Sequence, residues 1–187
     1  MPLGILTMNK QEELIAMCKR GDPAAYTELY NEHAGAVYNT IVRLVKHTAE
    51  AEDILQESFV AAFQGIARFT QAGGFRAWVK RIAINKSIDW IRKRKINFVE
   101  LEPHLVPVAD EEIMDESPFQ FTMNAVAAAI ELLPDNYRTI FTLYVVENIP
   151  QAEIAQMLGL KNTTVRTQYH RAKQKLLSTL TKSGCYE

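Results

Sequence analysis

The stretch IPQAEIAQMLGLKNTTVRTQYHRAKQKL, residues 149–176, predicts two short helices joined by a tight turn. Ala155 is small enough to let two helix backbones cross closely, and Gly159 can take the positive φ that ends a helix. Val165, ten residues after Ala155, faces back into the pair. Pro150 suits the first helical position, where its missing N–H costs nothing. The spacing of Ala155, Gly159 and Val165 is typical of a helix-turn-helix.

The second helix of this pair carries hydrogen-bonding and basic side chains, which suit base edges and phosphates in a DNA major groove. The set consists of Thr163, Thr164, Arg166, Thr167, Gln168, His170, Arg171 and Lys173. The alternative is an ordinary helical hairpin with a solvated basic face. The sequence therefore predicts duplex DNA binding as a hypothesis to be tested.

The composition predicts an all-α protein with a folded core. Apolar residues make up 48% of the 187 residues, which is enough for one domain or two small ones. Long stretches have helical periodicity, alternating β-branched residues are scarce, and the chain has only 8 Gly and 7 Pro to interrupt helices.

No metal, cofactor or membrane is expected. Cys18 and Cys185 lie near opposite ends without a CxxC motif, which argues against a disulfide framework or a zinc site. His33 and His47 stand alone, which favours packing or surface roles. The start of the chain lacks the features of a signal peptide, and no apolar run reaches about 18 residues. A cytoplasmic protein without membrane insertion is expected.

The charge pattern divides the chain into three blocks. Residues 1–96 hold 14 basic and 10 acidic residues. Residues 97–122 hold 7 acidic residues and no basic one, and residues 123–187 hold 7 basic and 5 acidic residues. Two mildly basic blocks are therefore separated by an acidic connector, although the net charge is only −1. This pattern favours two nucleic-acid-facing modules on a tether.

The first module is predicted to be a helical domain of residues 8–96. Four helices are expected in it. The first covers residues 9–20, and the second starts after the cap Asp22 with Pro23 and runs to about Lys46. The third covers residues 49–69 with Thr48 as its cap, and the fourth covers residues 75–95. An acidic linker of residues 97–117 follows. The second module, residues 118–182, adds helices that start at Pro118 and Pro134 and then the helix-turn-helix. The Pro134 helix is expected to bury Tyr137, Ile140, Phe141, Tyr144 and Val145.

The helix predicted for residues 75–95 has two apolar faces, with Phe75, Trp78, Val79 and Ile82 on one and Ile84, Ile88 and Ile91 on the other. Basic residues are interleaved, and residues 92–95 are all Arg or Lys. Basic residues also suit the C-terminal end of a helix dipole, which is the alternative explanation. Aromatic side chains, a Gly-containing loop and dense positive charge together favour a surface for unpaired bases and phosphates.

Asp53 and Glu57 form a carboxylate pair four residues apart on the helix predicted for residues 49–69. Acid–base catalysis is one interpretation, but no histidine or pocket-type residue accompanies the pair, and a solvated helix face is favoured. A protein-contact face is the third interpretation. No catalytic residues are predicted, so the chain is not expected to be an enzyme.

Three strings in this order resemble the extracytoplasmic-function (ECF) group of bacterial sigma-70-family RNA polymerase factors. They are DILQESFVAAF, FRAWVKRIAINKSIDWIRKRK and LPDNYRTIFTLYVVENIPQAEIAQMLGLKNTTVRTQYHRAKQKL. The resemblance spans residues 10–180 and implies a sigma factor that binds core polymerase, recognises the −35 and −10 promoter elements and promotes melting. It also implies contacts with the clamp helices and flap of the large polymerase subunits, and an anti-sigma protein as regulator.

The resemblance also implies roles for individual residues. Asp53, Ile54, Leu55, Gln56 and Glu57 match the segment that binds the clamp helices. The −10 element is expected to meet Thr70, Gln71, Trp78, Lys80, Arg81, Asn85, Trp90, Arg92 and Lys93. The −35 element is expected to meet Thr163, Thr164, Arg166, Thr167, His170, Arg171 and Lys173.

Three departures from the family pattern concern the last helix, and one of them is Thr163 in place of a common Gly or Asn. Lys161 stands where the family usually has a Ser helix cap, so Asn162 or Thr163 is expected to cap instead. Gln168 replaces a common Arg, which removes one expected phosphate contact.

Two other functions fit the sequence less well than that of a sigma factor. A plain helix-turn-helix repressor would not need the aromatic and basic helix of residues 75–95. An enzyme acting on nucleic acid would need a nucleophile or metal constellation, and no clustered carboxylate–histidine set is present.

Overall fold

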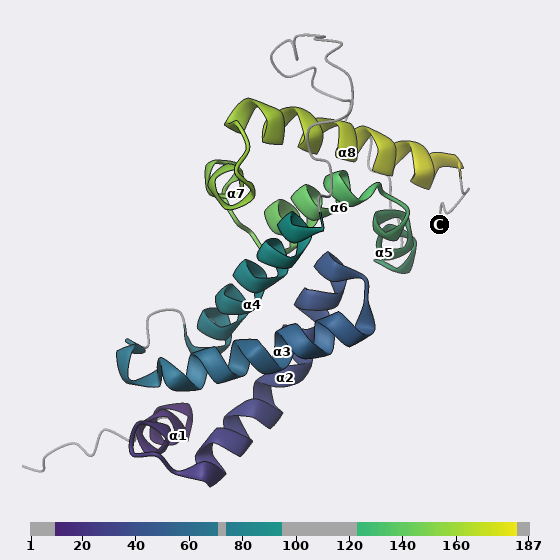
Figure 1. Ribbon diagram of the computed structural model, residues 1–187. Coiled ribbons are helices and arrows are strands. Elements are labelled where there is room, and N and C mark those ends of the chain that lie inside the picture. Colours follow the sequence, from purple (N-terminus) through teal and green to yellow (C-terminus); the bar gives the residue numbers. More distant parts are fainter. Residues whose placement is uncertain (1–9, 71–73, 95–122, 183–187) are drawn as a thin grey trace, which may run out of the picture. The chain divides into compact units, whose positions relative to one another are not determined.

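The computed structural model describes residues 10–70, 74–94 and 123–182. The described residues form helices and turns without a β-strand, and they divide into two compact units between Trp90 and Ile91 (Figure 1). The predicted all-α class with two helical regions is therefore confirmed. The predicted linker, residues 97–117, and the predicted helix start at Pro118 lie outside the described residues.

The first unit contains α1 (Lys10–Lys19), α2 (Pro23–Val45), α3 (Thr48–Gln64), the 3-10 turn η1 (Ile66–Arg68) and α4 (Gly74–Lys93), which continues past the division. Asp22 caps α2 as predicted, because its carboxylate accepts a 2.9 Å hydrogen bond from the Ala24 N–H, and Pro23 is the first helical residue. The core of the unit is aliphatic and aromatic. It includes Leu29, Val37, Ile41, Leu44, Phe59, Phe75 and Val79.

Two details of α3 differ from the prediction. His47, rather than Thr48, occupies the cap position, because the His47 carbonyl accepts the first helical hydrogen bond from Ala51 at 2.9 Å. The helix also ends at Gln64 instead of continuing to Phe69. Gly65 has φ −90° and ψ 0°, which redirects the chain into η1.

The two apolar faces predicted for α4 form one buried stripe that winds around the helix. Its residues are mostly four apart, and four residues cover slightly more than one turn, so each lies a little further round the axis. The stripe consists of Phe75, Val79, Ala83, Ile84, Ser87, Ile88 and Ile91. Trp78 and Ile82 flank it and are half-buried.

The second unit contains, besides the last residues of α4, the helices α5 (Met123–Glu131), α6 (Asp135–Phe141), α7 (Gln151–Leu158) and α8 (Asn162–Lys182). Between α6 and α7 lies a π-helical turn, η2 (Thr142–Val146). Its core cluster joins α5, α6 and α8. The buried members are Ala129, Leu133, Tyr137, Phe141, Ala172, Leu176 and Leu180.

The π-turn breaks the single helix that was predicted to run from Pro134 to Asn148. A π-turn holds more residues than an α-turn, so it shifts the faces of the side chains that follow. Val145, predicted to be buried, is 48% exposed for this reason, and Tyr144 is half-buried. Tyr137, Ile140 and Phe141 precede the turn and are buried as predicted.

Candidate functional site

The turn between α7 and α8 has the geometry that the sequence predicted. Gly159 adopts φ 67° and ψ 33°, and its N–H donates to the carbonyls of Ala155 and Gln156. Ala155 and Val165 are buried, at 5% and 0% exposure, where the two helices meet. Pro150 lies one residue earlier than predicted, at the cap position, because its carbonyl accepts the first hydrogen bonds of α7. The helix-turn-helix is therefore present.

One side of α8 carries a row of polar and basic side chains, of which Thr163, Arg166 and Lys173 are exposed and the other two are half-buried. Its members are spaced by one, three and four residues, so they share one face of the helix. We call this set the α8 row: Thr163, Arg166, Thr167, His170 and Lys173. Thr167 also donates its hydroxyl to the Thr163 carbonyl at 2.9 Å, which leaves its oxygen as an acceptor. Thr164 and Arg171, which are also half-buried, lie beside the row because they project from a neighbouring side of the helix.

Gln168 does not belong to the presented set. It is 8% exposed, because it lies three residues after Val165 and four before Ala172, both fully buried. Its Oε1 atom is buried without a hydrogen-bond donor among the described residues. The expectation that α8 presents Gln168 was wrong, and the three-and-four spacing from Val165 could have revealed it.

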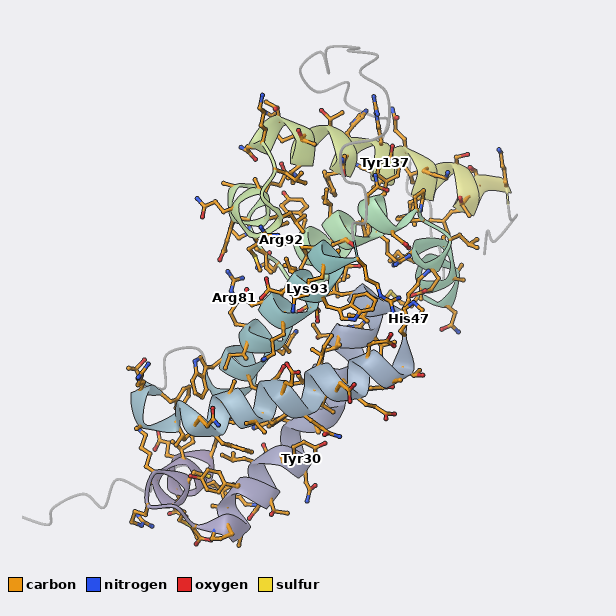
Figure 2. The ribbon with its side chains drawn as sticks, in the orientation of Figure 1. Tyr30, His47, Arg81, Arg92, Lys93 and Tyr137 are labelled. Carbon is orange, nitrogen blue, oxygen red and sulfur yellow. The ribbon has the colours of Figure 1, made fainter. Side chains whose placement is uncertain are left out.

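Four of the residues predicted for the −10 element lie together on α4. We call the set spaced by three and four the α4 row: Trp78, Arg81, Asn85, Asp89 and Arg92. Asn85, Asp89 and Arg92 are exposed, while Trp78 and Arg81 are half-buried. Figure 2 shows the side chains of Arg81 and Arg92 projecting from this helix.

The other residues predicted for this element are not in the α4 row. Trp90 and Lys93 share a second side of α4, where the Trp90 ring lies 5.8 Å from the His47 ring. Lys80 lies on a third side. Thr70 is exposed, and Gln71 falls outside the described residues.

Trp78 belongs to an aromatic cluster at the start of α4. Its ring centroid lies 5.1 Å from that of Phe69 and 5.9 Å from that of Phe75. Phe69 and Phe75 are buried, and the Lys19 ammonium donates to the Phe69 carbonyl at 3.1 Å. Phe69 and Phe75 are thus anchored in the core, with Trp78 beside them.

The carboxylates predicted to face a partner protein are exposed on α3. Asp53, Gln56 and Glu57 point to solvent, whereas Ile54 and Leu55 are buried in the core at 6% and 8% exposure. The two aliphatic residues therefore position the exposed ones. The face continues beyond the predicted residues. We call it the α3 row: Asp53, Gln56, Glu57, Val60 and Gln64. The sequence prediction omitted Val60, which is 54% exposed, although its spacing from Gln56 places it on this face.

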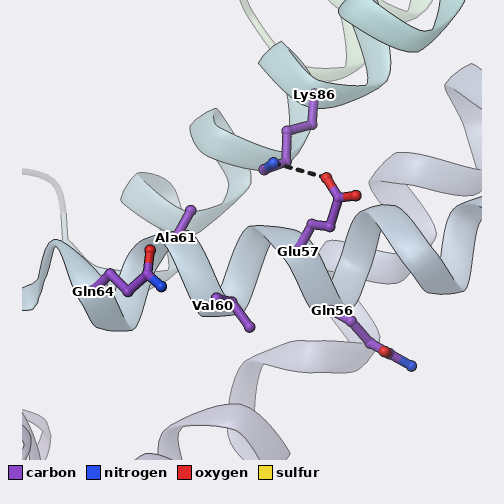
Figure 3. A pocket seen from close by; sticks show the side chains of 6 residues that line it. All are labelled: Gln56, Glu57, Val60, Ala61, Gln64 and Lys86. Atoms are coloured by element: carbon purple, nitrogen blue, oxygen red, sulfur yellow. Dashed lines mark hydrogen bonds and ion pairs between the residues drawn. The ribbon is translucent and has the colours of Figure 1, made fainter.

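A shallow groove of about 360 Å³ runs along the α3 row (Figure 3). Gln56, Glu57, Val60, Ala61 and Gln64 line it from α3, and Lys86 reaches it from α4. The Lys86 ammonium pairs with the Glu57 carboxylate at 2.8 Å. The Glu57 side chain remains 65% exposed, so it can accept a further donor.

The chemistry offered by these faces is hydrogen bonding, charge and aromatic contact. Within residues 10–70, 74–94 and 123–182, no three His, Cys, Asp or Glu side chains gather as metal ligands. In the same part of the chain, no helix is both long and apolar enough to cross a membrane.

Comparison with known proteins agrees with this layout. Residues 29–96 match the family model for Sigma-70 region 2, and residues 123–176 match that for Sigma-70, region 4. The ECF RNA polymerase sigma factor SigW of Bacillus subtilis is 30% identical over 172 residues, which cover 87% of this chain and 92% of that protein. The chain belongs to the ECF group of the sigma-70 family.

Two solved structures are similar in fold. The structure of CnrH in complex with the cytosolic domain of CnrY has a TM-score of 0.51 and 23% identity, and the match covers 93% of this chain and 99% of that one. The sigma factor RpoE of Bartonella quintana, solved in complex with the anti-sigma factor NepR, has a TM-score of 0.50 and 19% identity, covering 83% and 96%. In this ECF sigma factor the α3 and α4 rows fall within region 2, and the α8 row falls within region 4.

Proposed function

We propose that this ECF sigma factor divides promoter recognition among its three rows. The α3 row binds the clamp helices of core RNA polymerase. The α8 row enters the major groove of the −35 element, and the α4 row with its aromatic cluster holds unpaired bases of the −10 element. Binding of both units to polymerase, the second through the flap, sets the distance between the two DNA readers.

The observation that carries this proposal is the placement of the α8 row on the helix-turn-helix frame. Buried Ala155 and Val165 fix the angle between α7 and α8, while Arg166 and Lys173 stay exposed. A recognition helix needs this combination, because its base-reading side chains must project from a rigid support. A solvated hairpin would need the exposed charges but not the close helix crossing.

The α4 row supports the melting part of the proposal. Asn85 can donate to and accept from a base edge, and Trp78 offers an aromatic surface seven residues earlier on the same face. Contacts that form only with unpaired bases stabilise the open state over the closed one, so binding shifts the equilibrium toward strand separation. A protein that acts through such contacts needs no covalent chemistry and no cofactor. As a partner of core polymerase, it works in the cytoplasm.

Regulation by an anti-sigma protein is part of the same proposal. The α3 row, with its open groove and the protruding Val60, is a surface on which a second protein could block polymerase binding. The support from similar proteins is that a sigma factor of related fold was solved with such a partner.

Run-off transcription tests the proposal. The purified chain is added to core polymerase that lacks any other sigma factor, with a library of genomic promoters as template. Specific transcripts that appear only when the chain is present are expected. Binding of the chain to the same promoters without any transcription would point instead to a repressor.

A further inference from the structure

One ion pair joins the α3 row to the helix that carries the α4 row. The Lys86 ammonium donates to the Glu57 Oε2 atom at 2.8 Å, and the two residues are 29 apart in the sequence. Figure 3 shows the Lys86 side chain reaching from α4 toward Glu57 on α3. The pair therefore connects a residue that we propose to bind polymerase with a helix that we propose to bind DNA.

The backbones on both sides of this ion pair are held in the core of the first unit. Ser58 follows Glu57 on α3, Ser87 follows Lys86 on α4, and both serines are 0% exposed. Each hydroxyl donates to a carbonyl of its own helix, at 2.6 Å for Ser58 and 2.8 Å for Ser87. The positions of the two helices are thus fixed, and only the side-chain conformations of Glu57 and Lys86 remain to be set.

The Glu57 carboxylate stays accessible to a partner protein while it is paired. Its side chain is 65% exposed on the groove, and that of Lys86 is 31% exposed. A carboxylate has about four acceptor positions, and one ammonium occupies only part of them. Lys86 therefore holds Glu57 without covering it.

Holding a glutamate in place affects how tightly it binds a partner. An exposed glutamate samples several side-chain conformations, and a partner must select one of them. Ordering a flexible side chain at an interface costs free energy, which a side chain ordered beforehand avoids. The benefit is modest, because water and salt screen an exposed ion pair.

We propose that Lys86 is a positioning residue for polymerase binding, because it holds the Glu57 carboxylate over the groove in the conformation that a basic group of the clamp helices binds. This inference rests on the proposed function, since it assumes that the α3 row meets core polymerase. It gives α4 a share in polymerase binding besides its proposed contact with DNA.

A double-mutant cycle tests this role, with the affinity of the complete, dye-labelled chain for core polymerase measured by fluorescence anisotropy. Lys86→Met removes the ammonium but keeps an unbranched side chain, and it is expected to weaken core binding roughly two- to fivefold, the range for an exposed ion pair. In a Glu57→Gln background the same change should have almost no effect, because no carboxylate remains to be positioned. Lys86→Arg should keep most of the parent affinity, since a guanidinium also pairs with a carboxylate.

Lys10→Met is the matched control. Lys10 forms an ion pair of the same length, 2.8 Å, with Glu28, and this pair joins α1 to α2 outside the three rows. The core affinity of Lys10→Met should equal that of the parent. A weakening by Lys86→Met that exceeds the control and disappears in the Glu57→Gln background is the result that the proposal requires.

A weakening by Lys86→Met that persists in full in the Glu57→Gln background would overturn the inference, since Lys86 would then act without Glu57. Equal core affinities for the parent and Lys86→Met would also overturn it, and a loss confined to promoter binding would assign Lys86 to DNA instead. The proposed function fails separately if Glu57→Gln alone binds core polymerase as tightly as the parent, and the inference then fails with it.

Discussion

At the scale of single residues, His33 is buried in the first unit with incomplete hydrogen bonding. It is 2% exposed, its Nε2 lies 3.4 Å from Gln11 Nε2, and its Nδ1 has no partner among the described residues. Its ring is 5.4 Å from the Phe75 ring at the start of α4. Burial lowers the pKa of His33, Glu32 beside it opposes this, and Arg76 adds to it.

The first prediction follows from that lowered pKa. Because the unfolded chain binds a proton on His33 more readily than the folded chain, stability is fully present above the ordinary pKa of about 6.5 and is lost as pH falls through the lower folded pKa. The slope from this group cannot exceed about 1.4 kcal/mol per pH unit. Urea unfolding between pH 8 and 5, followed by tryptophan fluorescence, measures it.

Both tryptophans, Trp78 and Trp90, lie in the first unit, so their fluorescence reports on the unit that contains His33. His33→Phe is the control, and its stability should fall less than that of the parent over this pH range. Identical pH profiles for the two proteins would contradict the role given to His33.

The second prediction separates two arginines of α8. Arg166 is in the α8 row, whereas Arg171 lies beside it and is half-buried. Arg166→Ala should cost about 1–3 kcal/mol of −35 binding and relax the preference for one base, because a central side chain reaches base edges. Arg171→Ala should weaken binding equally on all sequences and lower the salt slope by about 1, as for a phosphate contact. Holoenzyme binding to −35 variants over a salt series measures both. Normal binding by both variants would exclude this face as the reader.

At the scale of helices and turns, α8 begins without a side-chain cap. The Lys161 carbonyl accepts hydrogen bonds from the N–H groups of Thr164 and Val165, so Lys161 occupies the cap position. The expectation that Asn162 or Thr163 would cap was wrong, because both lie inside the helix. A lysine offers no acceptor to the free N–H groups, and its charge opposes the helix dipole.

The third prediction is that Lys161→Ser stabilises the second unit by about 1 kcal/mol, because the serine hydroxyl accepts from a free N–H of the first turn. Lys161→Ala is the control, since it removes the charge without adding a cap and should stabilise less. Far-UV circular dichroism during urea unfolding measures the change, with tryptophan fluorescence separating the first unit. Equal stabilities of the serine and alanine variants would contradict the cap assignment.

Local chemistry explains which elements the sequence could predict. Asp22-Pro23 and Gly159 act through their own backbone and side-chain preferences, so the start of α2 and the end of α7 follow from single residues. The π-turn at Thr142–Val146 has no such marker, because tertiary packing can insert a residue into a helix without a special residue type. Because the π-turn could not be predicted, the exposure of Val145, which follows from that turn, could not be predicted either.

The candidate sites were predictable to a similar extent. Spacing alone predicted that Trp78 and Asn85 share one face, and it identified the polar side of α8. It could not place Trp90 and Lys80, because their positions depend on how the buried stripe of α4 winds around the helix. The polymerase-binding role predicted for Ile54 and Leu55 came from a family motif. Such a motif does not separate exposed residues from the buried residues that support them.

At the scale of the whole molecule, two units must act on one polymerase and one promoter. The fourth prediction is that Asp53→Arg combined with Glu57→Arg weakens core binding by roughly 2–5 kcal/mol, because reversed charges meet a complementary surface. The Glu57 change also removes the partner of Lys86. Affinity for core polymerase, measured by fluorescence titration, tests this.

The control for that variant is Glu13→Arg combined with Glu52→Arg, which makes the same change of charge at exposed residues outside the α3 row. Its core affinity should stay near that of the parent, and helicity should be unchanged in both variants. Equal core affinities for the two double variants would show that the α3 row is not the polymerase contact.

The fifth prediction concerns strand opening, which distinguishes a sigma factor from a mere DNA-binding protein. Asn85→Ala should form the closed complex normally but open the −10 region less, by roughly 1–3 kcal/mol, because the lost amide contacts exist only with unpaired bases. Asn85 is exposed, so its replacement by alanine should leave folding intact. Trp78→Ala is less informative, since Trp78 also packs against Phe69 and Phe75.

The most direct measurement is permanganate reactivity of thymines near position −10, with core polymerase, a promoter found by run-off transcription, and the parent chain or Asn85→Ala. The account predicts strong reactivity with the parent chain, none without it, and reduced reactivity with Asn85→Ala that a pre-melted template largely restores. Full opening by Asn85→Ala on duplex DNA would contradict the assignment of the α4 row. Transcription-competent binding without any thymine reactivity for the parent chain would contradict the claim that this protein melts promoters.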